Sequence, residues 1–202
     1  MDPKVMFNIT YGLYLLTARQ MGKDNGCIIN SVMQVAENPV RIAVSVLKGS
    51  LTHDMIAATG VFNVSAITTG ADFALFQRFG MQSGRTVDKF ADFPHAARSE
   101  NTIYRLRQNA NMFLSAVVTQ QIDLGTHTLF IAEVVDGEIL SNEPGCTYGY
   151  YQSDIKPKAK KTSSIKQWEC KICGFVYEGD EVPDDYECPL CLHGKDAFVL
   201  IA

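Results

Sequence analysis

The chain has 202 residues, of which 47% are hydrophobic and 20% charged, a composition typical of a soluble globular protein with one ordinary domain and a small one. Its net charge is −4, and no basic face large enough for nucleic acid is evident. No apolar stretch could span a bilayer, and the first ten residues lack signal-peptide features. We therefore expect a cytoplasmic protein with no nucleic-acid and no membrane partner.

Strand-like and helix-like segments follow one another along the first 150 residues. Six segments have the alternation or β-branched composition of strands: 12–18, 27–35, 40–46, 61–67, 111–122 and 126–140. Two segments have helical spacing and end at a glycine: 50–59, closed by Gly60, and 71–79, closed by Gly80. Residues 21–26 predict a turn between the first two strands, and the Asn25-Gly26 pair within them is a strong hairpin signal.

This order of elements favours a mainly β fold. Strict strand–helix–strand alternation, which would give a parallel doubly wound sheet, is missing. We expect a closed or half-closed antiparallel barrel with a few short helices over residues 1–151, since closure removes exposed strand edges. Residues 152–166 contain 5 Lys and 1 Asp and predict a flexible tether. Residues 167–202 contain 2 Lys and 8 Asp or Glu, a net charge of −6, and form a separate small module.

Four cysteines of this module form two Cys-x-x-Cys pairs, Cys170 with Cys173 and Cys188 with Cys191. Two such pairs can place four thiolates at the corners of a tetrahedron, which suits Zn²⁺ or a single iron. Five aromatic residues around the pairs can pack a miniature core: Trp168, Phe175, Tyr177, Tyr186 and Phe198.

The pattern Cys-x-x-Cys-Gly-x-x-Tyr followed by Cys-Pro-x-Cys resembles rubredoxin over about residues 167–200. The resemblance implies one iron, cycling between Fe³⁺ and Fe²⁺, on Cys170, Cys173, Cys188 and Cys191. Leu192 departs from the family, which usually has glycine after the last cysteine. A structural zinc ribbon is the alternative, because Zn²⁺ accepts the same ligands.

Residues 1–151 contain no dinucleotide-binding or phosphate-binding glycine motif, so a Rossmann domain is not expected. The stretch from Phe79 to Phe90 instead combines a glycine turn with Ser83, Arg85 and Lys89, which together can hold a phosphate group. An ordinary solvated turn has the same composition, so the residues alone leave both interpretations open.

Several stretches resemble the flavin reductase family of FMN-binding split barrels: 25–31, 44–46, 52–54, 79–90 and 127–133. The resemblance implies a homodimer that binds FMN noncovalently. By this likeness the flavin ring and ribityl chain would lie against Cys27, Ile28, Ile29, Asn30 and Ser31. The ring would be flanked by Ser45, Val46, Leu47 and Lys48. The ribityl-phosphate end would be held by Ser50, Thr52, His53, Ser83, Gly84, Arg85 and Lys89. His127 would lie near the flavin or nicotinamide, or would be a structural histidine of its strand.

The order of the two domains resembles the fused flavin reductase–rubredoxin proteins of anaerobic bacteria, the high-molecular-weight rubredoxins. This likeness implies an enzyme that takes hydride from NADH or NADPH onto FMN and passes electrons to iron. A flavodiiron protein, which reduces nitric oxide or oxygen, would then be the acceptor. No side chain need act as a catalytic acid or base, since the cofactors carry the chemistry. The alternatives are a free-flavin reductase with a structural zinc-ribbon tail and a non-catalytic flavin-binding redox sensor.

Overall fold

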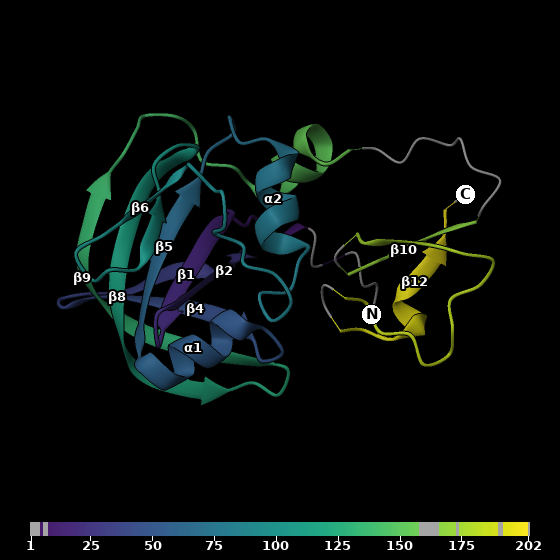
Figure 1. Cartoon of the computed structure of the whole chain (residues 1–202), viewed down its shortest axis with the longest axis horizontal. Coiled ribbons are helices and arrows are strands. Elements are labelled where there is room, and N and C mark those ends of the chain that lie inside the picture. Colours follow the sequence, from purple (N-terminus) through teal and green to yellow (C-terminus); the bar gives the residue numbers. More distant parts are fainter. Residues whose placement is uncertain (1–4, 6–7, 158–165, 173, 190–191, 202) are drawn as a thin grey trace. The chain divides into compact units, whose positions relative to one another are not determined.

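The structure is a computed structural model that describes residues 5, 8–157, 166–172, 174–189 and 192–201 (Figure 1). The chain divides into two compact units, Met1–Lys156 and Pro157–Ala202. Of the segment expected to be a linker, the first residues belong to the short helix η2 (Tyr151–Ile155), and 158–165 lie outside the described residues. Within the described residues, no helix is long and apolar enough to cross a membrane.

The first unit is an antiparallel β structure with short helices, as expected. Its elements are β1 (Tyr14–Gln20), β2 (Lys23–Ile29), β3 (Val32–Glu37), β4 (Val40–Leu47), α1 (Leu51–Thr59), β5 (Val61–Ile67), α2 (Phe73–Gly80), β6 (Ala96–Arg98), β7 (Tyr104–Leu106), β8 (Ala110–Asp123), β9 (His127–Ile139), α3 (Tyr148–Tyr150) and η2. Seven strands form one sheet in the order β2-β1-β5-β8-β9-β4-β3, and β6 pairs with β7. Every strand pairing in the sheet is antiparallel.

The connection between the two edge strands explains why the sheet curls. Strands β2 and β3 lie at opposite edges of the sheet, yet only Asn30 and Ser31 separate them in the chain. The sheet must therefore bend until its edges approach, as its curvature in Figure 1 shows. The Ser31 hydroxyl stabilises this corner, since its Oγ donates to the Ser45 carbonyl at 2.9 Å and accepts from the Ser45 N–H at 3.2 Å. The predicted split barrel is confirmed.

Strand β1 is buried on both faces because one helix packs on each. Its residues Leu16 and Ala18 belong to an apolar cluster that includes Met55 and Ile56 of α1. A second cluster joins the other face of β1 to α2 through Leu15 of β1 and Leu75, Phe76 and Phe79 of α2. The two helices are thereby fixed against the same part of the sheet, and their termini hold the loops that follow them in place.

The hairpin turn forms at the start of the expected turn over 21–26, and not at Asn25-Gly26. Met21 and Gly22 form it, with φ of 49° and 82°, and Asn25 and Gly26 lie inside β2, opposite Ala18 and Thr17. The expected strand over 27–35 is likewise the end of β2 followed by the start of β3. Long-range contacts of Asn25 outweigh its local turn preference, because its side-chain Nδ2 donates to Thr52 Oγ1 of α1 at 2.9 Å.

The second unit is small and is held by one apolar cluster. Its elements are β10 (Gln167–Cys170), β11 (Val176–Glu178), η3 (Lys195–Ala197) and β12 (Phe198–Leu200), and the strands form a sheet in the order β11-β10-β12. The buried residues are Cys170, Val182, Cys188 and Phe198, with all four other expected aromatic residues packed against them. The indole N–H of Trp168 donates to the Gly179 carbonyl at 3.0 Å. The predicted aromatic core is confirmed.

Candidate functional site

The first turn of α1 and the segment 83–89 contain the residues expected at a phosphate end. Helix α1 begins after Ser50, whose Oγ accepts the N–H of His53 at 3.1 Å. The first turn of a helix carries further N–H groups with no partner inside the helix, so it favours an anion. Arg85 extends over this turn, and its guanidinium donates to the Asp54 carboxylate at 2.7 Å and to the Gly49 carbonyl at 3.4 Å.

A chain of hydrogen bonds fixes His53. Its Nδ1 lies 3.1 Å from the Asp54 carboxylate and its Nε2 lies 2.9 Å from Thr128 Oγ1 on β9. A carboxylate can only accept, so Nδ1 donates to Asp54, and Nε2 shares a second hydrogen bond with the Thr128 hydroxyl. The Arg85 hydrogen bond and then the His53 hydrogen bond hold the pKa of Asp54 below its ordinary value, against the opposing effect of partial burial. The residues form a connected polar wall from the segment 83–89 to β9.

Lys89 is buried, with 4% of its surface exposed. Its ammonium donates to the Gly26 carbonyl of β2 and the Phe79 carbonyl of α2, both at 3.0 Å. Burial lowers its pKa, and the neighbouring Cys27 thiol acts in the opposite direction. Lys89 therefore cross-links β2 to the C-terminal end of α2.

Strand β2 brings Cys27 to the same place. Burial raises the pKa of the Cys27 thiol, while a hydrogen bond with Thr52 and the charge of Lys89 act against that increase. Thr52 is fully buried and also accepts the side-chain N–H of Asn25. The expected phosphate-end residues thus form one group around the start of α1, with Cys27 at its margin.

The residues expected around the flavin ring form a second group on β2 and β4. Ile28 packs with the α2 cluster, whereas Cys27 and Ile29 pack with the α1 cluster. Ser31, next to the half-buried Asn30, is bonded to Ser45 as described above. Val46 is buried and Leu47 half-buried at the end of β4, and Lys48, the residue after the strand, is also half-buried.

The end of β4 pairs with the start of β9, which brings His127 to the ring group. Leu47 lies opposite His127, and Lys48 Nζ contacts the Asp123 carboxylate of the β8–β9 turn at 2.6 Å. The Nδ1 of His127 lies 2.9 Å from Thr126 Oγ1. The pairing of β4 with β9 therefore places His127 beside the end of β4.

The two cysteine pairs are described in part, since Cys173 and Cys191 lie outside the described residues. Cys170 and Cys188 are both fully buried. Cys170 N–H donates to Phe175 O and its carbonyl accepts from Gly174 N–H; Cys188 does the same with His193 and Leu192, at 2.7–2.8 Å. These matched backbone loops fit a site in which each pair presents two thiolates to one metal.

Leu192 adopts the conformation that glycine adopts in the first pair. Its φ is 59°, against 74° for Gly174. A leucine in this region is strained, yet the hydrogen bond to Cys188 is kept. Although Leu192 departs from the rubredoxin pattern, the second loop therefore keeps the backbone conformation and the hydrogen bond that Gly174 gives the first loop.

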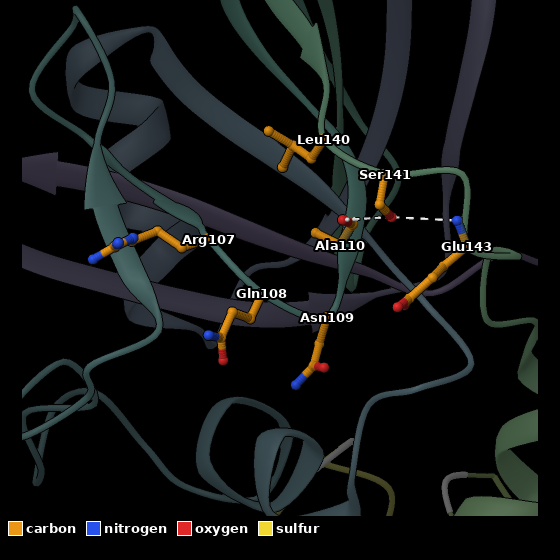
Figure 2. Close-up of a pocket in the computed structure, with 7 residues that line it drawn as sticks. All are labelled: Arg107, Gln108, Asn109, Ala110, Leu140, Ser141 and Glu143. Carbon is orange, nitrogen blue, oxygen red and sulfur yellow. Dashed lines mark hydrogen bonds between the residues drawn. The ribbon is translucent and has the colours of Figure 1, made fainter.

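Figure 2 shows a hollow that lies apart from all these residues. It has a volume of about 340 Å³ and is lined by Arg107, Gln108, Asn109, Ala110, Leu140, Ser141 and Glu143. The Ser141 hydroxyl donates to the Ala110 carbonyl and accepts from the Glu143 N–H, both at 3.3 Å. It thereby links the start of β8 to the segment that follows β9. No residue of the expected flavin site lines this hollow.

Sequence reasoning missed three side chains that the structure adds to the phosphate-end group. The sequence placed Asn25 in a turn, and nothing in the neighbouring sequence indicates that its side chain bonds to Thr52. Asp54 follows His53 directly, so the Thr52-His53-Asp54 run was the available signal for it. Thr128 comes from β9, which no sequence spacing relates to α1.

Comparisons with known proteins agree with this organisation. The family model described as flavin reductase like domain matches residues 6–159, and the one described as rubrerythrin, rubredoxin-like domain matches 168–199. The chain is 34% identical to a protein of Moorella thermoacetica named high molecular weight rubredoxin, over 98% of this chain and 99% of that one. It is 33% identical to a ferric-chelate reductase (NAD(P)H) of Archaeoglobus fulgidus, over 82% and 97% respectively.

Solved structures show the same fold for the first unit. One is an NADH:FAD oxidoreductase of Streptomyces globisporus, with a TM-score of 0.64 and 22% identity over 72% of this chain and 89% of that one. Another is an FMN-binding protein of Thermus thermophilus, with a TM-score of 0.63 and 20% identity over 70% and 78%. The chain is an oxidoreductase that belongs to the flavin reductase-like family and carries a rubredoxin-like domain at its C-terminal end.

Proposed function

We propose that the chain takes hydride from NADH or NADPH onto a noncovalently bound FMN and passes the electrons singly to one iron. A flavin reductase-like domain implies a flavin and a nicotinamide, and a rubredoxin-like domain implies iron. The relative that matches nearly the whole chain is named a high molecular weight rubredoxin. The observation that carries the choice of FMN is the meeting of the α1 N-terminus with the segment 83–89.

The phosphate of FMN would bind at the start of α1. Ser50 caps the helix without blocking its outer N–H groups, and Arg85 is already positioned over the first turn. Ser83 accepts the N–H of Arg85 at 3.2 Å, which fixes the turn that presents both side chains. A phosphate that engages Arg85 would draw it from Asp54, and His53 would keep Asp54 in place. The buried Lys89 would contribute its charge.

The flavin ring would lie against the second group of residues, on β2 and β4. Its chemistry when bound is to accept two electrons as hydride and to release them one at a time. The chain would hold the ring by backbone groups of 27–31 and of 45–48, and the apolar side chains between them would exclude water from it. His127, at the start of β9, would face the nicotinamide side; the alternative for it is a purely structural role.

The iron would be held by Cys170, Cys173, Cys188 and Cys191. Four thiolates can bind either iron or Zn²⁺, so the choice of iron over zinc is itself proposed here. The two described cysteines are buried and have matched backbone partners. The lysine-rich segment that follows η2 would act as a tether and bring the module to its electron donor.

The acceptor would be a protein with a basic docking surface, and we propose a flavodiiron protein. The module has a net charge of −6, and Lys195 is already paired with Glu181 and Asp184. The remaining carboxylates would attract a basic surface and accelerate encounter. We propose a homodimer as the assembly of the first unit.

A visible spectrum before and after anaerobic addition of NADH tests the relay in the purified full chain. The expected result is loss of the flavin band followed by loss of the ferric band, resolved by stopped flow. Cys173→Ser is the comparison: flavin reduction should persist while electron delivery to a protein acceptor is lost.

Three results would each contradict part of the proposal. A flavin band that bleaches while the iron stays ferric would exclude the internal relay. A colourless, zinc-only protein from iron-replete cells would exclude iron. Flavin that is lost on dialysis during turnover would favour a free-flavin reductase, and negligible NADH oxidation with every acceptor would favour a redox sensor.

A further inference from the structure

Asn25 and Gly84 touch in the interior of the phosphate-end group. Asn25 is 2% exposed and its Nδ2 donates to Thr52 Oγ1, in the first turn of α1, at 2.9 Å. A Cβ added to Gly84 would lie 2.0 Å from Asn25 Oδ1 and 2.5 Å from its Cγ. Both distances are far below van der Waals contact. Only a residue without a side chain lets the segment 83–85 approach Asn25 so closely.

Close approach, rather than backbone conformation, is the reason for glycine at this position. The glycines of this chain with a positive φ are Gly22, Gly60, Gly125 and Gly174 among the described residues, and Gly84 is not one of them. Its φ is therefore accessible to any residue. The side-chain amide of Asn25 takes the space that a side chain at Gly84 would need.

The Asn25 amide is also not optimised for stability alone. Its Oδ1 is buried and has no hydrogen-bond partner among the described residues. A buried acceptor without a partner costs roughly 1–3 kcal/mol. The amide stands at this position despite that cost, and its Nδ2 supplies the hydrogen bond to Thr52 that ties β2 to the start of α1.

We infer that Asn25 is a positioning residue that, with Gly84, sets the spacing between the start of α1 and the segment 83–85. Asn25 holds α1 through Thr52 on one side and meets Gly84 on the other. Arg85, the next residue, reaches across to Gly49 and Asp54 at the outer end of the same gap. The spacing fixes the width of the anion site, so the pair selects flavins that end in a phosphate.

This inference rests on the proposed function, since it assigns the phosphate end of FMN to that gap. FMN and riboflavin share the ring and the ribityl chain and differ only in the phosphate. A change in the width of the gap should therefore weaken FMN binding and leave riboflavin binding nearly unchanged.

Binding of FMN and of riboflavin to the flavin-free full chain, followed by quenching of flavin fluorescence, tests the pair. Gly84→Ala should weaken FMN about tenfold or more, because displaced charge-assisted hydrogen bonds are each worth that much. Riboflavin affinity should change less than about threefold. Adding Asn25→Ala to Gly84→Ala should raise the FMN affinity back to that of Asn25→Ala alone, since the smaller residue makes room for the new methyl group while the bond to Thr52 stays lost.

Gly145→Ala is the matched control. Its Cβ would meet nothing closer than Asn111 Nδ2 at 3.6 Å, an ordinary contact, so neither flavin should be affected. If Gly84→Ala does not fold, as judged by circular dichroism, Asn25→Ala alone decides: it should reduce the preference for FMN over riboflavin.

Several results would overturn the inference. They are equal weakening of both flavins, no weakening by Gly84→Ala, no recovery in the double variant, or no change of preference in Asn25→Ala. A wild-type chain that binds riboflavin as tightly as FMN would also overturn it. A wild-type chain that binds neither flavin would instead contradict the proposed function.

Discussion

Replacing Lys89 by methionine should destabilise the first unit by about 3 kcal/mol. The ammonium donates two hydrogen bonds to buried carbonyl groups, those of Gly26 and Phe79, and hydrogen bonds from charged donors are worth about 1.5–3 kcal/mol each. Methionine removes both but returns about 1–2 kcal/mol, because it buries an apolar side chain and no charge has to leave water. The two cross-linking bonds outweigh that return.

Urea unfolding followed by far-ultraviolet circular dichroism measures the effect. A loss of about 3 kcal/mol corresponds to a fall of roughly 6–12 °C in Tm for a unit of this size. Lys48→Met is the control, since its ion pair with Asp123 lies at the surface, where such pairs contribute little. Lys48→Met should be close to wild type. A Lys89→Met variant as stable as Lys48→Met would refute the assignment of Lys89 as a buried cross-link.

The same residue gives a pH dependence of known sign. Burial lowers the pKa of Lys89 from its ordinary value of 10.5, so the folded chain loses this proton at a lower pH than the unfolded chain. Between the folded pKa and 10.5 the unfolded state binds more protons, and the free energy of unfolding should rise with pH. That rise should be absent in Lys89→Met.

Three further changes test the capping and strain described above. The Leu192→Gly variant should lose metal to a chelator about fivefold more slowly than the Leu192→Ala variant, because alanine is strained at a φ of 59° and glycine is not. The reverse order of the two rates would exclude backbone strain at this position. Arg85→Met should raise the pKa of Asp54 towards its ordinary value of 3.8, seen by carboxyl NMR, so that the stability this carboxylate contributes at neutral pH and loses as pH falls through its folded pKa becomes smaller; an unchanged pKa would exclude the pair. Ser50→Ala should cost about 1 kcal/mol by thermal unfolding and Ser50→Gly only a few tenths; equal losses would exclude the cap to His53.

Local sequence signals predicted those parts of the fold where the local preference and the tertiary structure agree. The strand over 61–67 is β5 residue for residue, and α1 has the expected cap at Ser50 and a left-handed Gly60. Helix α2 starts later than expected, at Phe73, because Asp72 caps it, and it includes Gly80. The preference failed at Asn25-Gly26, where partners from α1 and from Lys89 hold the pair in a strand.

The site could be predicted only as a set of stretches. The stretches at 50–53 and 83–89, which we expect at the phosphate end, lie close together, since Arg85 bonds to Gly49 and Asp54 on either side of the first stretch. The sequence could not show which of these residues form hydrogen bonds with one another. Lys89 bonds to the backbone of β2 and α2, and Arg85 bonds to Asp54, because distances between loops depend on how α1 and α2 pack on β1.

The indole of Trp168 has a practical consequence. It is the one tryptophan of the chain, and it belongs to β10 of the second unit, with its N–H fixed on Gly179. Its emission therefore reports the melting of that unit, while circular dichroism is dominated by the larger sheet. Two optical signals from one cuvette can thus show whether loss of the metal leaves the flavin reductase-like unit intact.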